Sequence, residues 1–366
     1  MRIAIVGTRG IPAGYSGFET CAEELGTRLV ARGHEVTVYC RSHHVTYPET
    51  TYRGVNLVKL PTIRNKYLDT LVHTALSCLH LIFGRHDLVL MFIVGNAPTI
   101  LIPRLFGLPV VLNVDGLDWQ RDKWPRPAKH YLQWCERLAG RLANTVVTDA
   151  RVVQEYYRQR YGRKTRLIAY GAEPRPGSPD GTLQRFGLRP RDYVLYVGRL
   201  VPENCAHDLV EAFERLDTDM RCVIVGDAPY ATEYQRQLRA RASDRILFTG
   251  YVFGQGYWEL INNAYAYVFP PQVGGTHPAL IEAMAAGNCV IVRDTPANLE
   301  VVGDAALPFS GQRPTESLAE RLRQVIDDPH LVEHYAGRAR NRIAARYSWE
   351  TVTDEYEALF RSLLDG

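Results

Sequence analysis

Short runs of consecutive apolar residues recur along the chain, and many of them end at a glycine or a small polar residue. Residues 3–6 (IAIV) and 193–197 (YVLYV) are the clearest runs, and a glycine follows each directly. Such runs are typical of parallel strands that are buried on both faces. Residues 18–31 instead carry apolar side chains every three or four positions, the spacing of an amphipathic helix. The alternation predicts βαβ units and a parallel sheet.

The predicted strands fall into two series, separated by a stretch rich in proline and glycine. The first series comprises residues 3–6, 35–40, 55–60, 88–93, 110–114 and 145–148. The second comprises residues 193–197, 221–225, 246–249, 264–269 and 290–292. Residues 168–177 (IAYGAEPRPG) lie between them and predict a linker. Ligands of such sheets bind at the carboxyl ends of the strands, so two facing sheets would share one cleft.

Composition agrees with a globular protein of two domains. The chain has 366 residues, of which 46% are hydrophobic and 23% are charged. We expect no signal peptide, and the most apolar helical segment, residues 68–84, is too short and too polar to cross a bilayer. The seven cysteines form no CxxC pair, which predicts free, mostly buried thiols in a reducing compartment. A cytoplasmic protein is therefore expected.

Charge is distributed unevenly between the two series. Up to Gly171 there are 23 Lys and Arg against 13 Asp and Glu, whereas the remainder has 20 against 27. The asymmetry indicates that the first half contacts something anionic, such as the inner face of the cytoplasmic membrane. The alternative interpretation is an ordinary solvated basic surface.

The first glycine-rich loop, residues 7–17 (GTRGIPAGYSG), connects a predicted strand to a predicted helix. Its glycines let the backbone approach a ligand, and the N–H groups at the helix start can hold an anion. The spacing is neither GxGxxG nor the Walker pattern, which argues against a nicotinamide dehydrogenase. A plain structural connection is the alternative.

A second such loop, residues 272–278 (QVGGTHP), also leads into a predicted helix. Pro278 suits the first turn of that helix, and Thr276 or His277 suits its cap. Glu282 lies one turn further on, where its carboxylate could accept hydrogen bonds from ribose hydroxyls. The alternative is that Glu282 is an ordinary surface acid of the helix.

Two charged residues follow predicted strands at their carboxyl ends. Arg199 comes directly after Gly198, where a cation suits a leaving diphosphate, although an ordinary surface arginine is the alternative. Asp115 follows the strand at 110–114 and could orient an acceptor hydroxyl or a sugar, or could merely cap a loop. Basic and aromatic side chains come next and could bind the phosphates of a lipid carrier or form a solvated helix face: Trp119, Arg121, Lys123, Trp124, Arg126 and Lys129.

Metal and cofactor chemistry has little support in the sequence. Residues 217–219 (DTD) have the letters of a DxD motif, but they precede a strand and so predict a turn. The eleven histidines are dispersed without ligand spacing. We expect no essential metal and no cofactor, and no nucleic acid as a partner.

Together, these motifs resemble those of retaining glycosyltransferases of family GT4. The likeness covers essentially the whole chain and is strongest to the branch that includes bacterial β-1,4-rhamnosyltransferases of cell-wall and capsule assembly. In the first half it rests on residues 10–20 (GIPAGYSGFET), 32–36 (RGHEV) and 115–124 (DGLDWQRDKW). In the second half it rests on residues 198–204 (GRLVPEN), 226–230 (GDAPY) and 274–284 (GGTHPALIEAM).

The resemblance implies an α/β protein of the GT-B fold, with two Rossmann-like doubly wound parallel-sheet domains facing across a cleft. Residues 1–171 would bind the acceptor and residues 172–347 the nucleotide sugar, while a helix over 348–366 packs back on the first domain. Enzymes of this family are thought to react on the donor's own face, with the leaving phosphate helping to deprotonate the acceptor.

The resemblance also assigns roles to residues of this chain. The catalytic set would be Asp115, Arg199 and Glu282. Donor contacts would come from Gly17, Phe18, Arg199, Asn204, Asp227, Gly275, Thr276, His277 and Glu282. Acceptor contacts would come from Glu19, Trp119, Arg121 and Lys123.

Three positions depart from the family pattern. Gly274 stands where the family has the first glutamate of a pair, and Gln272 stands where the narrower branch often has an acid. Asn204 replaces a phosphate-binding lysine that many members have. Phosphate neutralisation then depends more on Arg199 and on the helix start at Thr276.

These expectations combine into one leading function. The protein would transfer a sugar, with L-rhamnose from dTDP-rhamnose as the best match, to a lipid-linked or oligosaccharide acceptor in cell-surface polysaccharide synthesis. A UDP-hexose-dependent transferase and a nucleotide-sugar epimerase on the same fold are alternatives. A degenerate, non-catalytic transferase that binds a lipid head group or a partner protein is a third.

Overall fold

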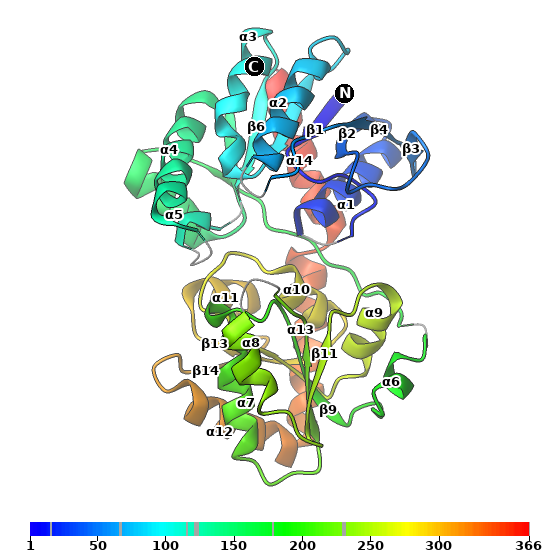
Figure 1. Ribbon diagram of the computed structural model, residues 1–366, viewed down its shortest axis with the longest axis vertical. Helices are drawn as coiled ribbons and strands as arrows, with labels where there is room; N and C mark the ends of the chain where they lie inside the picture. Colours follow the sequence, from blue (N-terminus) through cyan, green and yellow to red (C-terminus); the bar gives the residue numbers. More distant parts are fainter. Residues whose placement is uncertain are drawn as a thin grey trace. The chain divides into compact units, whose positions relative to one another are not determined.

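The computed structural model describes residues 1–14, 17–65, 68–114, 116–120, 124–177, 179–228 and 232–365. The chain divides into two compact units. The first unit is Met1–Gly171 together with Trp349–Gly366, and the second is Ala172–Ser348. Each unit is built around a parallel sheet with helices packed on it (Figure 1). The predicted α/β class is therefore confirmed.

The sheet of the first unit has eight strands in the order β3-β4-β2-β1-β5-β6-β7-β8. All neighbours are parallel except β3 and β4. Its strands are β1 (Arg2–Val6), β2 (Glu35–Arg41), β3 (Thr51–Tyr52), β4 (Val55–Leu60), β5 (Leu88–Phe92), β6 (Val110–Val114), β7 (Thr145–Thr148) and β8 (Arg166–Leu167). The central strands β5 and β6 are buried along their whole length, as their continuous apolar runs require.

The helices of the first unit include one from the far end of the sequence. They are α1 (Gly17–Ala31), α2 (Asp69–Leu81), α3 (Leu101–Leu105), α4 (Arg126–Leu142), α5 (Arg151–Tyr161) and α14 (Trp349–Leu364), with 3-10 turns η1 (Val94–Ile100) and η2 (Asp118–Gln120). Helix α14 packs against α1. Asn113 of β6 donates to the Tyr356 hydroxyl at 2.6 Å, and Arg32 forms ion pairs with three acids of α14.

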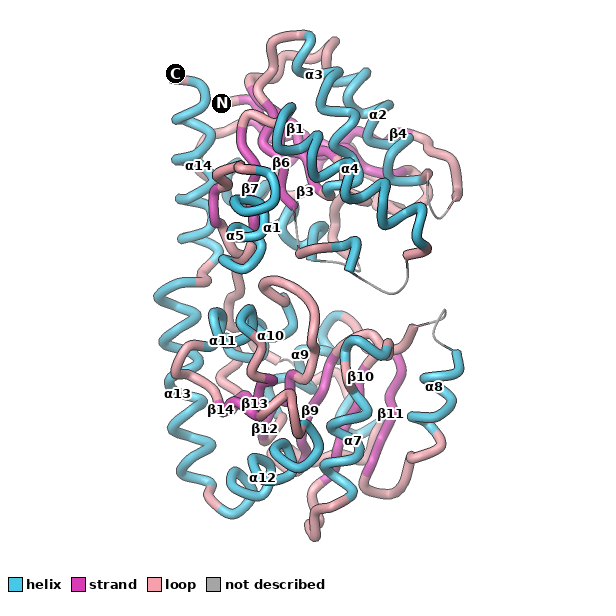
Figure 2. The backbone as a smooth tube through the Cα atoms, turned by 90° about the vertical axis from the view of Figure 1, so that its left-hand side faces the viewer, coloured by secondary structure: helices cyan, strands magenta, loops and turns pink. Residues whose placement is uncertain are grey.

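The sheet of the second unit has six parallel strands in the order β11-β10-β9-β12-β13-β14 (Figure 2). They are β9 (Tyr193–Val197), β10 (Arg221–Val225), β11 (Ile246–Gly250), β12 (Ala266–Phe269), β13 (Cys289–Arg293) and β14 (Leu307–Phe309). The strand order reverses between β9 and β12. In doubly wound sheets this switch point opens a crevice at the carboxyl ends of the strands.

Eight helices of the described chain and one 3-10 turn complete the second unit. They are α6 (Thr182–Arg185), α7 (Ala206–Glu214), α8 (Thr232–Arg239), α9 (Gly254–Asn263), α10 (Pro278–Ala285), α11 (Pro296–Val302), α12 (Pro314–Asp327), α13 (Pro329–Arg346) and η3 (Pro202–Asn204). Residues 217–219 lie in the loop before β10, as predicted.

Two predictions about the chain as a whole can be compared with the structure. All seven cysteines are buried free thiols, as predicted. Among the described residues, no helix combines the length and the apolar character that crossing a membrane requires.

Candidate active site

Two loops leave the same edge of the second sheet at its switch point. Arg199 follows β9 by two residues, and residues 272–277 follow β12. Because β9 and β12 are adjacent and parallel, both loops emerge at the carboxyl edge. The Gln272 amide donates to the Glu203 carbonyl at 3.1 Å and joins the two loops. The structure thus brings the predicted phosphate-binding arginine loop and the second glycine loop together.

The turn that carries Arg199 is held by its own carbonyl group. The Arg199 carbonyl accepts hydrogen bonds from the Val201 amide at 2.9 Å, from the Asn204 side chain at 2.9 Å and from the Tyr196 hydroxyl at 3.3 Å. The Arg199 side chain is half-buried. Asn204 therefore shapes the turn, and its contact with a donor phosphate stays a prediction.

Close approach of the backbone explains two glycines beside this turn. Gly226 has φ +132°, and a Cβ there would lie 1.9 Å from the Gly198 carbonyl oxygen.

Asp227 follows at the carboxyl end of β10. Its carboxylate accepts from the Ala228 amide at 2.8 Å and pairs with Arg239 at 3.1 Å. Asp227 thus has local partners at the edge where a donor contact is predicted.

His277 accounts for the glycine at position 274. Gly274 has φ +146°, and a Cβ there would lie 2.0 Å from His277 Nε2. The imidazole also packs edge-on against Phe269, with ring centroids 4.9 Å apart. The space in which the family has a glutamate side chain is therefore filled by an imidazole. His277 is also the N-cap residue of α10, as one of the two expected caps, and Thr276 before it is buried.

A tyrosine from another helix orients Glu282. The Tyr257 hydroxyl of α9 donates to Glu282 Oε2, and the Glu282 side chain remains partly exposed. Burial, followed by the nearby Glu282 charge, raises the pKa of Tyr257 well above its ordinary value. The phenol is therefore a neutral donor at physiological pH. Nothing in the sequence marks Tyr257 as a site residue, because it lies 25 residues before its partner and in no motif.

Two buried side chains hold the base of the second glycine loop. Arg293, at the end of β13, donates through Nε to the Pro270 carbonyl at 2.7 Å and forms an ion pair with buried Asp208. Asn298 donates to the Pro271 carbonyl at 3.2 Å. Sequence reasoning missed all three residues, because they belong to no recognised motif and their contacts join segments that are distant in sequence.

In the first unit, the glycines of the first loop serve packing. Gly7 has φ +95°, and a Cβ there would lie 2.4 Å from the Phe92 carbonyl oxygen. Gly10 has φ +115°, and a Cβ there would lie 2.6 Å from Cys40. The loop therefore lies tightly against the ends of β5 and β2. The glycines therefore have a packing role, whether or not the loop also contacts a ligand as predicted.

Glu19, predicted to contact the acceptor, is only 4% exposed. Its carboxylate accepts from the Arg9 amide at 2.8 Å and thereby holds the first glycine loop. The acceptor contact of Glu19 stays a prediction, whereas its hold on the loop is visible.

The remaining predicted residues of the first unit are partly described. Gly17 begins α1, and Phe18 packs edge-on against Phe92 and Tyr170, with ring centroids 5.7 and 6.5 Å away. Trp119 packs on the core beside Tyr156. Three predicted residues lie outside the described residues: Asp115, Arg121 and Lys123.

Comparison with known proteins indicates which class of enzyme this chain belongs to. Residues 184–342 match the family described as Glycosyl transferases group 1, and residues 1–173 match a domain of unknown function, DUF1972. The α-D-kanosaminyltransferase of Streptomyces kanamyceticus is 25% identical over 285 residues, which cover 72% of this chain and 73% of that protein. The protein is a glycosyltransferase. Its second unit carries the group 1 domain, which supports the GT4-like family indicated by the motifs.

Solved structures support the GT-B fold of this glycosyltransferase. Sucrose-phosphate synthase from Thermosynechococcus elongatus superimposes with a TM-score of 0.83 at 21% identity, covering 100% of this chain and 99% of that one. Anabaena HepE in complex with UDP-glucose gives a TM-score of 0.78 at 17% identity, covering 99% and 100%. The predicted GT-B fold and glycosyltransferase activity are therefore confirmed. Membership of the rhamnosyltransferase branch stays a prediction.

Proposed function

We propose that this glycosyltransferase moves a sugar from a nucleoside diphosphate to a saccharide or lipid-linked acceptor, with dTDP-L-rhamnose as the donor. The observation that carries the proposal is the junction of the Arg199 turn with the second glycine loop, made by the bond from Gln272 to Glu203. An arginine loop and a helix start at the same sheet edge can supply a cation and a backbone N–H donor for a diphosphate.

Different residues of the site contact different parts of the donor. Arg199 stabilises the charge that develops on the departing diphosphate, and the Ala279 amide in the first turn of α10 binds one of its oxygens. Glu282, oriented by Tyr257, accepts hydrogen bonds from the ribose hydroxyls. The leaving phosphate then takes the proton of the acceptor hydroxyl as the new glycosidic bond forms on the same face. This scheme needs no metal ion.

The surroundings of Gly274 favour a deoxy sugar. In place of a carboxylate that could bind sugar hydroxyls, this position presents the His277 imidazole packed on Phe269. A 6-deoxy sugar requires no partner for a 6-hydroxyl group. A UDP-hexose is the second candidate donor, because HepE, which shares the fold, was solved with UDP-glucose.

The donor is tested by calorimetry and turnover with dTDP-rhamnose and UDP-glucose. We expect tighter binding and faster consumption of dTDP-rhamnose. Arg199→Ala should lower kcat by about 10²- to 10³-fold, the usual loss for one charge-stabilising contact. Arg323→Ala, an exposed arginine of the same unit, is the control and should leave kcat unchanged. Preference for UDP-glucose would select the second candidate, and an unaffected Arg199→Ala would contradict the proposed site.

We also propose that the first unit contacts an anionic membrane surface. Helices α2 and α4 both pack against η1, and α3 packs against α2 (Figures 1 and 2). Their outer sides expose eight large apolar side chains, here called the α2–α4 face: Leu76, Leu79, Phe83, Leu101, Leu105, Phe106, Tyr131 and Trp134. Aromatic side chains of this kind are typical of membrane interfaces.

Positive charges outnumber negative charges around the α2–α4 face. Five exposed arginines lie on or beside these helices: Arg85, Arg104, Arg126, Arg137 and Arg141. The described residues 69–114, 116–120 and 124–142 contain four acids, Asp69, Asp87, Asp118 and Glu136, and Asp69 pairs with Arg41. Asp87 pairs with Arg2, and Glu136 is buried. Such a surface is attracted to anionic lipids and can place its apolar side chains in the interface.

Liposome sedimentation tests this contact. We expect binding to anionic vesicles at low salt, weaker binding at high salt, and little binding to neutral vesicles. Arg137→Glu and Trp134→Ser should each weaken binding, and Arg323→Glu in the second unit is the matched control. If binding is the same at low and high salt and in both variants, this face is not the docking surface.

A further inference from the structure

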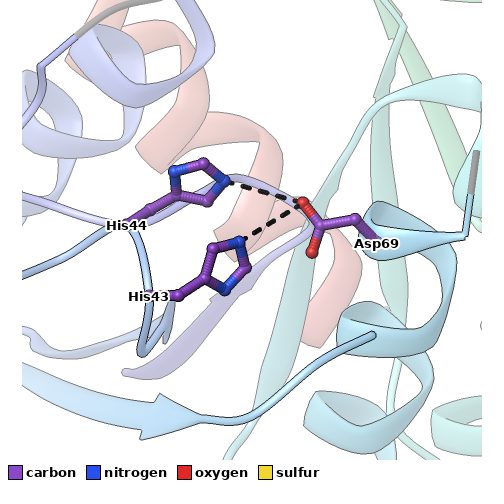
Figure 3. Close-up of side chains that lie close together, drawn as sticks. All are labelled: His43, His44 and Asp69. Carbon is purple, nitrogen blue, oxygen red and sulfur yellow. Dashed lines mark ion pairs between the residues drawn. The ribbon is translucent and has the colours of Figure 1, made fainter. Parts of the chain in front are cut away.

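Three potential metal ligands meet at the carboxyl edge of the sheet of the first unit. His43 and His44 follow β2, and Asp69 is the first residue of α2 (Figure 3). The Nε2 atoms of His44 and His43 lie 3.6 and 3.8 Å from Asp69 Oδ2. A nitrogen of each imidazole and an oxygen of the carboxylate all lie within 4.8 Å of one another. Three ligand atoms thus converge on one point.

These separations suit a bound ion better than hydrogen bonds. An N–H···O bond spans about 2.7–3.2 Å, so the imidazoles are too far from Oδ2 to donate to it. Zinc binds histidine nitrogen and carboxylate oxygen at about 2.0–2.2 Å, which places two ligands of a tetrahedral site about 3.4 Å apart. The two imidazole–carboxylate distances need to shrink by only a few tenths of an ångström to reach that separation.

The exposure of the histidines also fits. The side chains of His43 and His44 are 16% and 35% exposed, so an ion can enter from solvent.

Arg41 binds the carboxylate oxygen that lies nearest the two imidazoles. It is buried, and its guanidinium donates to Asp69 Oδ2 at 2.7 Å and to the Thr70 hydroxyl at 3.0 Å. Ligating carboxylates are commonly held by such outer partners. The other oxygen, Oδ1, is buried and has no hydrogen-bond partner among the described residues, so it can still accept. The nearby positive charge will weaken cation binding but leaves the ligand geometry intact.

A second group with metal-ligand chemistry lacks these properties. Cys205, His207 and Asp208 also lie close together. However, the His207 ring already shares a hydrogen bond with the Tyr234 hydroxyl at 2.9 Å, and Asp208, like Asp69, is paired with a buried arginine. Burial raises the pKa of the Cys205 thiol to about 11, so no thiolate is present at neutral pH. This group therefore serves as an internal comparison.

We propose that His43, His44 and Asp69 form a site for a divalent transition-metal ion, with Zn²⁺ as the best match. Three protein ligands leave a fourth coordination position for water or another ligand. The ion would fasten the loop after β2 to the start of α2. Arg41 also connects this point to the first glycine loop, since its amide donates to the Arg9 carbonyl at 2.9 Å.

Cobalt titration of the tag-free, chelator-treated protein tests the site, because Co²⁺ replaces Zn²⁺ and absorbs visible light when bound. We expect one Co²⁺ per chain, an absorption band of a four- or five-coordinate ion, and displacement by Zn²⁺. His43→Ala and His44→Ala should each weaken binding at least tenfold and abolish the band. His207→Ala, which removes the imidazole of the comparison group, should leave both unchanged.

Two results would overturn the proposal. One is the absence of a Co²⁺ band in the unmodified protein, and the other is a band that survives both His43→Ala and His44→Ala. Asp69→Asn is a weaker test because it leaves the buried Arg41 charge unpaired, so its fold is first checked by circular dichroism. Both histidines are partly exposed, and their alanine variants are expected to fold normally.

Discussion

The Tyr257 hydroxyl and the Glu282 carboxylate come from different helices, and their hydrogen bond decides where the carboxylate points. A carboxylate that binds ribose loses affinity for the nucleotide when it is free to rotate. Tyr257 acts on the donor only by positioning Glu282. Its loss should therefore weaken donor binding more than it slows the chemical step.

Tyr257→Phe removes this hydrogen bond and keeps the ring. Hydrogen bonds to charged groups contribute about 1.5–3 kcal/mol, so we expect the donor KM to rise by about one to two orders of magnitude. The change in kcat should be much smaller. Tyr335→Phe in α13 is the control, and equal effects of the two variants on KM would refute a positioning role for Tyr257.

His73 of α2 makes stability depend on pH. The side chain is fully buried, and burial lowers its pKa to about 4, below the ordinary value of 6.5. Between these pH values the unfolded chain binds a proton that the folded chain does not, so acidification favours unfolding. From pH 7.5 to pH 5 the free energy of unfolding should fall by about 2 kcal/mol from this group.

Calorimetry of the unmodified protein and of His73→Leu checks this expectation. The loss of melting temperature between pH 7.5 and pH 5 should be smaller in the variant. An identical loss in both proteins would mean that other groups cause the acid sensitivity.

At the scale of elements, the sequence predicted every described strand of four or more residues, because most of them are apolar runs that are buried along their length. Strands β3, β8 and β14 escaped because two or three residues carry no periodicity. Helix α13 was not distinguished, since alanines such as Ala336 and Ala339 contribute to its buried stripe and give little hydrophobic contrast.

The candidate site was predicted unevenly for a related reason. Arg199 and the loop at 272–278 stand at strand ends, where the chain itself reveals their position. Tyr257, Arg293 and the cluster around Asp69 depend on contacts between segments distant in sequence, which a single sequence does not disclose.

In the second glycine loop, Gly274 stands where the family usually has a glutamate. At Gly274 both the positive φ and the His277 ring exclude a side chain. Gly274→Glu, which restores the family's usual acid, should therefore displace the loop and lower donor affinity by at least tenfold. Gly337→Ala is a matched control, because a Cβ there meets nothing within 4 Å and alanine favours the middle of α13. Higher activity of Gly274→Glu would show that the loop can rearrange.

At the scale of the whole molecule, the second unit is inserted between two parts of the first. Helix α14 supplies the Tyr356 ring and hydroxyl, which are buried against β6, and three acids that pair with Arg32. The first unit is therefore incomplete without the end of the described sequence.

Removal of residues 349–366 should destabilise the first unit alone. We expect calorimetry to show the loss or a large downward shift of one melting transition, with the other transition retained. Removal of residues 365–366 only is the control. Equal shifts of both transitions would indicate that the two units unfold together.

Because α14 is synthesised after the second unit but packs on the first unit, it also affects the order of folding on the ribosome. When Gly171 emerges, the first sheet is fully translated, but the helix that covers Asn113 will not exist for nearly 180 further residues. At translation rates of about 5–20 residues per second, the nascent first unit waits roughly ten to forty seconds with that surface open. During this interval the later unit can finish folding first, so the part of the protein that is made earliest is completed last.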